Sequence, residues 1–239
     1  ETNKYIERLE LIRKIVHFSR KSNFYSISII GKPGTGKSTL AHLLALMISK
    51  YSLYTNRGEA LDEENLKALY KVVKKQKKVV MILDDFSFMV SGRTNKDRER
   101  LYNLFRVRHI LGEDKTYYVI FVAHYLRSLA PTLRASYIKI LTSVDIAETK
   151  IYYSEAMFSM NSLLTYYEYL QQYKDQNIIL VNKGEEHIIN VTLTDVKELT
   201  KKKRVEKMNE WSLLKYKFYK RKALMFFKRN ISESEYNDG

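Results

Sequence analysis

The chain has 239 residues, 45% of them hydrophobic, which suffices for one α/β domain of ordinary size or for a core domain with an appendage. It contains no cysteine, and this excludes a disulfide framework and a zinc knuckle. With 42 lysines and arginines against 27 acidic residues, the net charge of +15 favours a polyanionic partner.

Neither a targeting signal nor a membrane span is expected from the hydropathy pattern. Charges are spread through residues 1–20, unlike the apolar centre of a secretory signal peptide. The longest apolar runs are interrupted by lysine, arginine or aspartate before they reach the length of a bilayer span. We therefore expect a cytoplasmic protein.

The first elements in chain order are a helix, a strand and a second helix. Residues 3–22 carry apolar side chains at helical spacing, which predicts an amphipathic helix. Residues 25–30 (YSISII) alternate in the way that is typical of a strand. Residues 39–50 (TLAHLLALMISK) combine strong helix formers with helical spacing, and they predict the second helix.

The segment between that strand and that helix, GKPGTGKS, matches the phosphate-binding loop pattern G-x-x-x-x-G-K-[ST]. Successive backbone N–H groups at a helix N-terminus converge on a phosphate in such a loop. Lys37 is predicted to reach the β- and γ-phosphates of ATP, and the Ser38 hydroxyl to bind Mg²⁺. The alternative is a glycine-rich turn without a ligand. The predicted nucleotide-binding residues are Gly31, Lys32, Pro33, Gly34, Thr35, Gly36, Lys37, Ser38 and Thr39.

A second acidic motif follows downstream. Residues 51–55 predict a short strand, and residues 62–77 a helix that begins with acids and ends with lysines, as the helix dipole favours. The apolar run at 79–83 (VVMIL) predicts a buried parallel strand, which ends in Asp84 and Asp85. We expect Asp84 to hold Mg²⁺ through water and Asp85 to orient or deprotonate the attacking water. Alternatively, these acids are structural.

Further strands and helices alternate up to about residue 145. Residues 117–123 and 137–141 predict two more strands, which favours a parallel sheet with right-handed crossovers. Residues 96–111 predict a helix before them, with these side chains facing the core: Leu101, Leu104, Phe105 and Ile110.

With these motifs the chain resembles the additional-strand class of P-loop ATPases, which includes AAA+ proteins and the FtsK–HerA DNA translocases. The resemblance covers residues 24–145 and depends on GKPGTGKS and VVMILDD. It implies a three-layer α/β fold, a mainly parallel sheet, and one strand inserted between the two motif strands. That strand carries a polar sensor residue, and His124 takes the position where family members often carry Asn, Thr, Ser or Gln. This departure leaves a simple loop-edge histidine as the alternative.

Residues 125–134 (YLRSLAPTLR) resemble the stretch that follows the sensor strand in AAA+ proteins. In oligomeric members an arginine near this point reaches the γ-phosphate of the neighbouring subunit. Arg134 and Arg127 are the candidates here, in that order, and a homo-oligomer with shared active sites is implied. The alternatives are a surface or DNA-facing arginine, or a finger supplied by the arginines of residues 93–108.

The pattern departs from ordinary AAA+ proteins beyond residue 145. Residues 156–173 predict an aromatic-rich helix, and residues 178–181 and 187–193 a β-hairpin with Gly184 at its turn. AAA+ proteins carry a three-helix lid here, whereas small viral or plasmid packaging ATPases of the FtsK–HerA type lack it and add strands. The pattern therefore favours a packaging motor.

Residues 195–229 predict a basic helical tail, with 13 lysines and arginines against 4 acidic residues. Its lysines can bind nucleic-acid phosphates without reading sequence, and aromatic rings such as Trp211 can stack on unpaired bases. Alternatively, its apolar stripe docks on the core or its basic face lies on a membrane.

The predicted protein is thus an α/β P-loop ATPase that acts on nucleic acid, DNA in the first place, as a ring-forming translocating or packaging motor. Two alternatives stay open: a replication switch of the DnaA or helicase-loader type, and a small-molecule kinase, against which the basic charge argues. Four segments are expected: an N-terminal helix at 1–23, the ATPase core at 24–145, a helix and hairpin at 146–194, and a basic extension at 195–239.

Overall fold

The computed structural model describes residues 22–49, 52–86, 94–156, 158–173, 177–191 and 228–229. The predicted N-terminal helix lies outside the described residues apart from its last position, as does the basic tail apart from its last two. Within the described ranges, no helix has the length and apolar character needed to cross a bilayer.

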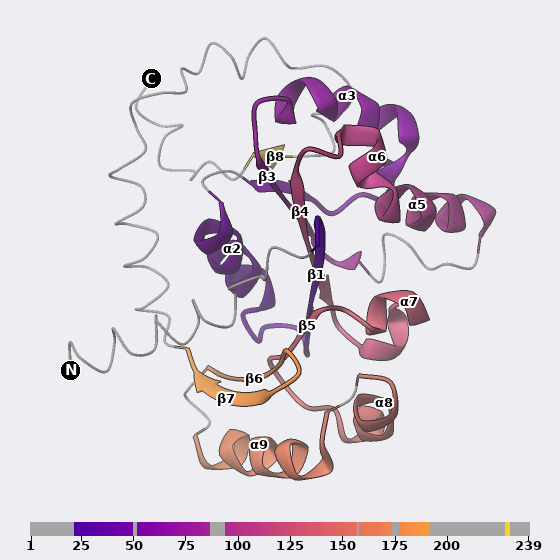
Figure 1. Ribbon diagram of the computed structural model, residues 1–239. Coiled ribbons are helices and arrows are strands. Elements are labelled where there is room, and N and C mark those ends of the chain that lie inside the picture. The colour runs from indigo at the N-terminus through magenta and orange to yellow at the C-terminus, as the bar shows by residue number, and fades with distance from the viewer. Residues whose placement is uncertain are drawn as a thin grey trace, which may run out of the picture.

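An eight-stranded sheet lies at the centre of the molecule, in the order β7-β6-β5-β1-β4-β3-β2-β8 (Figure 1). Its parallel strands are β1 (Phe24–Ile30), β2 (Ser52–Thr55), β3 (Lys78–Leu83), β4 (Thr116–Ala123) and β5 (Ile138–Leu141). Strands β6 (Ile178–Asn182), β7 (Glu186–Asn190) and β8 (Lys228–Arg229) pair antiparallel. Because β4 lies between β1 and β3, the inserted strand expected from the sequence is confirmed.

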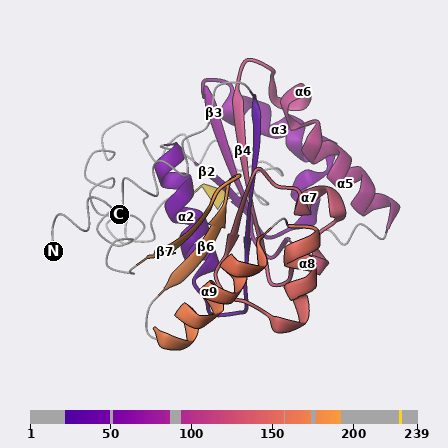
Figure 2. The same ribbon diagram turned by 60° about the horizontal axis from the view of Figure 1, so that its bottom comes forward.

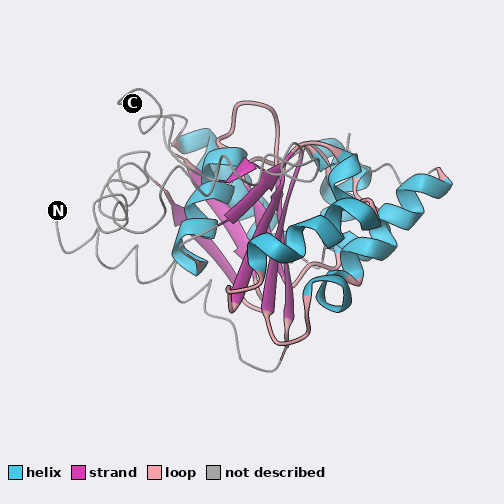
Figure 3. Cartoon of the chain, turned by 90° about the horizontal axis from the view of Figure 1, so that it is seen from above, coloured by secondary structure: helices cyan, strands magenta, loops and turns pink. Residues whose placement is uncertain are grey.

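Helices cover both faces of this sheet, as Figures 2 and 3 show. On one face α2 (Lys37–Ile48) packs its leucines into the same buried cluster as Ile27 and Val122 of the central strands. The other face carries α3 (Glu63–Val73), α5 (Asn95–Phe105), α6 (Val107–Leu111), α7 (Pro131–Arg134), α8 (Thr149–Ser154) and α9 (Met160–Gln172). Short 3₁₀ turns are η1 (Gly58–Leu61), η2 (Leu126–Ser128) and η3 (Ile146–Glu148). The predicted three-layer α/β fold is confirmed.

The central strands read as apolar runs because both of their faces are buried. In β4 every residue from Tyr117 to Ala123 is buried, and in β3 every residue from Val79 to Leu83. Alternate side chains of β3 enter different clusters: Met81 packs with α3 and α6, and Val80 with α2. A continuous run of this kind is what a parallel sheet between two helical layers requires.

The helix predicted at 96–111 is two helices. Arg106 interrupts it with φ −93° and ψ 7°, outside helical geometry. The break turns the chain so that Val107 and Leu111 join the core. Phe105, predicted to face the core, is 40% exposed instead and lies beside Phe24 at the edge of that cluster.

The segment after residue 145 extends the sheet on the β5 side. The predicted hairpin is confirmed, with Gly184 at φ 91° in its turn, and its first strand pairs antiparallel with β5. Helix α9 anchors this addition, because the buried Tyr166 hydroxyl lies 2.8 Å from Ile178 O and 3.0 Å from Leu141 O, and these two carbonyls share its single proton. The short helix α8 was not predicted.

The last two residues predicted for the basic helical tail are a strand instead. Lys228 and Arg229 pair antiparallel with Tyr54 and Leu53 of β2, at the opposite edge of the sheet from β7. An edge strand offers unpaired backbone groups, and this pairing satisfies some of them, which helical propensity in the tail does not take into account.

Replacing Tyr166 by Phe is expected to lower the free energy of unfolding by about 1–3 kcal/mol, because two buried carbonyls would lose their donor. The matched control is Tyr167→Phe, since Tyr167 is 36% exposed. Chemical denaturation of both variants measures the difference. Equal stability of the two variants would contradict the anchoring role of the Tyr166 hydroxyl.

Candidate active site

The predicted site residues meet at the carboxyl ends of the parallel strands. The phosphate-loop motif connects β1 to α2, the acid pair follows β3, and His124 follows β4. The end of β1 is tied to its neighbour by a hydrogen bond from Gly31 N to Ala123 O at 3.2 Å. Ligands of open α/β sheets bind at this edge.

The loop conformation depends on glycine just before α2. Gly36 adopts φ 75° and ψ 15°, a left-handed conformation that a side chain disfavours, and α2 begins at Lys37. An α-helix leaves its first N–H groups without intrahelical acceptors. The first amides of α2 therefore stand at the loop with the positive end of the helix dipole, a suitable arrangement for a phosphate.

The end of β5 holds the loop in place. Ser143 Oγ accepts a hydrogen bond from Lys32 N at 2.7 Å, and the Thr35 and Thr142 hydroxyls lie 2.6 Å apart. A Cβ on Gly31 would come within 2.1 Å of Thr142 Oγ1. Sequence reasoning missed Thr142 and Ser143, the two residues after β5, although polar residues directly after a predicted parallel strand were an available signal.

Lys37 is only 6% exposed, and its ammonium group donates to Lys32 O within the loop at 2.7 Å. Burial lowers the pKa of Lys37, and the nearby carboxylates of Asp85 and Asp84 oppose that shift. The charge of Lys37 thus lies in a partly desolvated place, between the loop and the acid pair, where a polyphosphate would interact with it strongly.

Asp84 is buried, and its carboxylate accepts hydrogen bonds from three groups among the residues that the structure describes. Ser38 Oγ donates to Oδ1 at 3.1 Å, and the backbone N–H of Asp85 donates to the same oxygen at 3.0 Å. The hydroxyl of Tyr54, on β2, donates to Oδ2 at 3.0 Å. Ser38 and Asp84, predicted from distant motifs, are therefore in direct contact. Tyr54 was missed, because nothing in a short strand indicates which residue of a neighbouring strand it faces.

Asp85 extends beyond the strand end and contacts the predicted sensor residue. Its φ is 49°, in the left-handed region that few residues other than glycine adopt, and its side chain is 53% exposed. His124 Nε2 lies 3.1 Å from Asp85 Oδ1. Because an ionised carboxylate only accepts, the histidine donates this bond. Uncommon backbone geometry at this point is compatible with a functional role for Asp85.

These groups fit ATP and magnesium chemically. A hydroxyl and a carboxylate oxygen in direct contact are hard oxygen donors, the kind that Mg²⁺ prefers. The backbone of residues 34–36 and the first amides of α2 supply donors for phosphate oxygens, and Lys37 supplies a positive charge. The Gly31 contact leaves no space for a side chain where the loop packs against Thr142 and Ser143.

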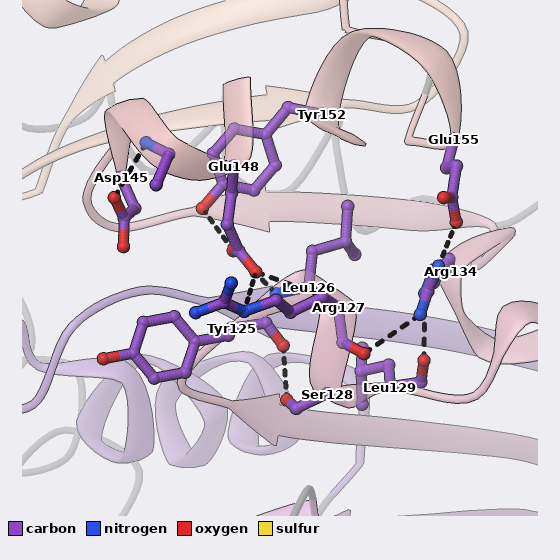
Figure 4. Close-up of polar contacts among 11 residues, drawn as sticks. Tyr125, Leu126, Arg127, Ser128, Leu129, Arg134, Asp145, Glu148, Tyr152 and Glu155 are labelled. Atoms are coloured by element: carbon purple, nitrogen blue, oxygen red, sulfur yellow. Dashed lines mark hydrogen bonds and ion pairs between the residues drawn. The ribbon is translucent and has the colours of Figure 1, made fainter. Parts of the chain in front are cut away.

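The two candidate arginines differ in what they contact (Figure 4). The guanidinium of Arg134 is mostly buried; it pairs with Glu155 and donates to the carbonyls of Leu129 and Arg127. The side chain of Arg127 is 61% exposed, and its Nε lies 3.5 Å from a carboxylate oxygen of Glu148. Within the described part of the chain, the hydrogen bonds and ion pairs of both arginines stay in this cluster.

Glu148 determines where the Arg127 segment lies. It is fully buried, and its two carboxylate oxygens accept from the backbone N–H groups of Leu126 and Arg127 at 3.0 and 3.1 Å. The Tyr152 hydroxyl donates to it at 3.0 Å, and this bond connects the carboxylate to α8. The backbone of η2 is therefore held to the η3–α8 segment, while the end of the Arg127 side chain is in solvent.

Gly31→Ala is expected to weaken nucleotide binding and to lower the free energy of unfolding by about 1–3 kcal/mol, through overpacking against Thr142. The Thr142 hydroxyl cannot move aside without losing its contact with Thr35. Thermal denaturation and binding of a fluorescent ADP derivative measure both effects. Adding Thr142→Ala should restore part of the loss, with Thr142→Ala alone as control. Unchanged stability and nucleotide binding in Gly31→Ala would contradict the close packing of Gly31 against Thr142.

Two of three comparisons with known proteins give matches, and these agree with this geometry. Residues 27–145 match the family model of the ATPase family associated with various cellular activities (AAA). Comparison with curated proteins gives no match.

Among solved structures, the chain is similar to the genome packaging NTPase B204 from Sulfolobus turreted icosahedral virus 2. Its sulfate complex gives a TM-score of 0.51 at 14% identity, over 72% of this chain and 98% of that chain. The AMPPCP complex gives 0.51 at 13% identity, over 72% and 100%. B204, the DNA-packaging ATPase from Sulfolobus turreted icosahedral virus, gives 0.50 at 16% identity, over 70% and 98%. At these identities the likeness shows the fold.

The family match covers both motifs and the strand inserted between them, and the fold likeness covers a larger share of the chain, 72%. Residues 27–145 are therefore an ATPase domain of the AAA family, built on the P-loop NTPase fold.

Proposed function

We propose that this ATPase acts on nucleic acid, DNA in the first place, as a translocating or genome-packaging motor whose subunits form a homo-oligomeric ring. The observation that carries the proposal is the architecture beyond residue 145, where a helix and two antiparallel strands extend the sheet. The packaging ATPases that the sequence resembles add strands at this position. The likeness in fold to B204, described as a DNA-packaging ATPase, supports the same function.

In the proposed reaction the phosphate loop, the acid pair and His124 have different roles. The amides of residues 34–39 bind the phosphates of ATP, and Lys37 balances the charge on the β- and γ-phosphates. Ser38 and Asp84 hold the magnesium, which when bound neutralises charge that develops on the phosphates. Asp85 orients the attacking water and accepts its proton, and His124 holds the Asp85 carboxylate in position through their hydrogen bond.

We assign the arginine that acts across the subunit interface to Arg127 rather than Arg134. Three contacts inside the subunit occupy the Arg134 guanidinium, which reverses the order expected from the sequence. Arg127 has an exposed side chain on a segment that Glu148 holds rigidly. A rigid backbone with an exposed guanidinium suits a group that must reach a neighbouring site.

The charge of the chain supports a nucleic-acid partner. A net charge of +15 gives a long-range attraction for polyanions, whereas a kinase for small metabolites gains nothing from it. Contacts of this kind are made to phosphates and weaken steeply with salt. The predicted DNA contacts of the basic tail fall almost wholly outside the described residues and stay a prediction.

The test of the proposed function is the rate of ATP hydrolysis with and without duplex and single-stranded DNA, together with the mass of the particle in solution. We expect DNA to stimulate hydrolysis in a ring-sized particle, and Lys37→Ala to abolish nucleotide binding or turnover. Negligible turnover with nucleotide-dependent assembly would support the replication switch instead. Phosphate transfer to an added metabolite would support the kinase, and an intact Lys37→Ala variant would contradict the site itself.

A second prediction concerns the shared site. Arg127→Ala should lower the hydrolysis rate by about 10³-fold or more, by analogy with arginine fingers in GTPases, with nucleotide affinity unchanged. Mixing Arg127→Ala subunits with Lys37→Ala subunits should recover part of the rate, because each supplies the group that the other lacks. Arg134→Ala should mainly lower the melting temperature. No recovery on mixing would contradict action between subunits, and a loss in Arg98→Ala instead would assign the finger to α5.

A further inference from the structure

Tyr54 connects three elements of the site. It lies on β2 in register with Ile82 of β3, two residues before the acid pair. From there its hydroxyl reaches past the strand end and donates to Asp84 Oδ2 at 3.0 Å. Its ring stacks on His42 of α2, with centroids 5.3 Å apart and planes 24° from parallel. His42 follows Ser38 by one helical turn, so the same ring faces the helix that begins at the phosphate loop.

The donors to Asp84 differ in whether they are also expected to bind magnesium. The hydroxyl of Ser38, on Oδ1, is also the group expected to bind magnesium, and binding would draw it away from the carboxylate. The backbone N–H of Asp85 contacts the same oxygen. The Tyr54 side chain donates to the other oxygen, Oδ2. Unlike the Ser38 hydroxyl, the Tyr54 hydroxyl is not expected to bind the metal itself. Once Ser38 turns away, the Asp85 N–H on Oδ1 and the Tyr54 hydroxyl on Oδ2 orient the carboxylate, and Tyr54 is the side chain of this pair.

The environment keeps Tyr54 a hydrogen-bond donor. Burial raises the pKa of the phenol, and the negative charge of Asp84 and its hydrogen bond raise the pKa further. The stacked His42 ring limits rotation of the phenol away from the carboxylate.

We propose that Tyr54 is a positioning residue for magnesium: it orients the Asp84 carboxylate toward the metal that accompanies the nucleotide. The inference rests on the proposed binding of magnesium and ATP at this site. Residues that donate a hydrogen bond to a metal ligand orient that ligand, and their loss typically costs about 10- to 100-fold in metal affinity or activity.

The experiment is a magnesium titration of the binding of a fluorescent ADP derivative, for the full chain and for Tyr54→Phe. The variant keeps the ring that stacks on His42 and loses only the hydroxyl. Its nucleotide affinity in EDTA should stay within about twofold of the wild type, whereas the magnesium concentration for half-maximal gain in affinity should rise about 10-fold or more. The matched control is Tyr117→Phe, which removes a hydroxyl bonded to Gly112 O at the amino end of β4.

The outcomes distinguish a failure of this inference from a failure of the proposed function. Absence of nucleotide binding by the wild type would overturn the proposed function, whatever the variant does. Magnesium-dependent binding by the wild type with an unchanged magnesium requirement in Tyr54→Phe would overturn only the role of Tyr54, as would an equal rise in the control. If Tyr54→Phe does not fold, the same titration is made with His42→Leu, which removes the ring stacked on Tyr54. This variant should need more magnesium for half-maximal gain in affinity, and an unchanged requirement would overturn the inference.

Discussion

Parallel pairing of β1 with β4 and β5, and of β4 with β3, is the constraint on which the site depends. In this register the last residue of β1, Ile30, lies beside Ala123 and Leu141. The chain therefore leaves all four strands at one edge of the sheet, where their polar successors converge. A strand between β1 and β3 adds His124 to the edge, next to Asp85. The sheet thus brings together residues that are between 39 and 111 positions apart in the chain.

The packing that forms this edge also builds unfavourable features into it. A lysine is almost fully buried beside two carboxylates, Asp85 adopts a backbone angle that few side chains favour, and Gly31 leaves no space for a Cβ. Each feature has a cost that a protein without a ligand here would have no reason to keep. A bound polyphosphate with its metal would interact favourably with the lysine, the amides and the acids together, which explains why they occur at one place.

Local pattern predicted much of this arrangement. The motif glycines and the apolar runs predicted the loop, the strands and the α/β class, because these features depend on neighbours in the chain. The break at Arg106, the exposure of Phe105 and the strand at Lys228 escaped prediction, since packing between distant segments decides them. The hydrogen bond of Tyr54 to Asp84 escaped it for the same reason: the register between strands, which the sequence alone does not give, determines it. Thr142 was overlooked although it directly follows a predicted strand.

The central claim is that the loop at residues 31–38 encloses the phosphates while Ser38 and Asp84 hold the magnesium. A crystal structure with a non-hydrolysable ATP analogue and Mg²⁺ tests it most directly. The account predicts phosphate density within the loop, in contact with Lys37, and a metal next to the serine and aspartate oxygens. Nucleotide density elsewhere, or an acid pair directed away from the phosphates, would contradict it.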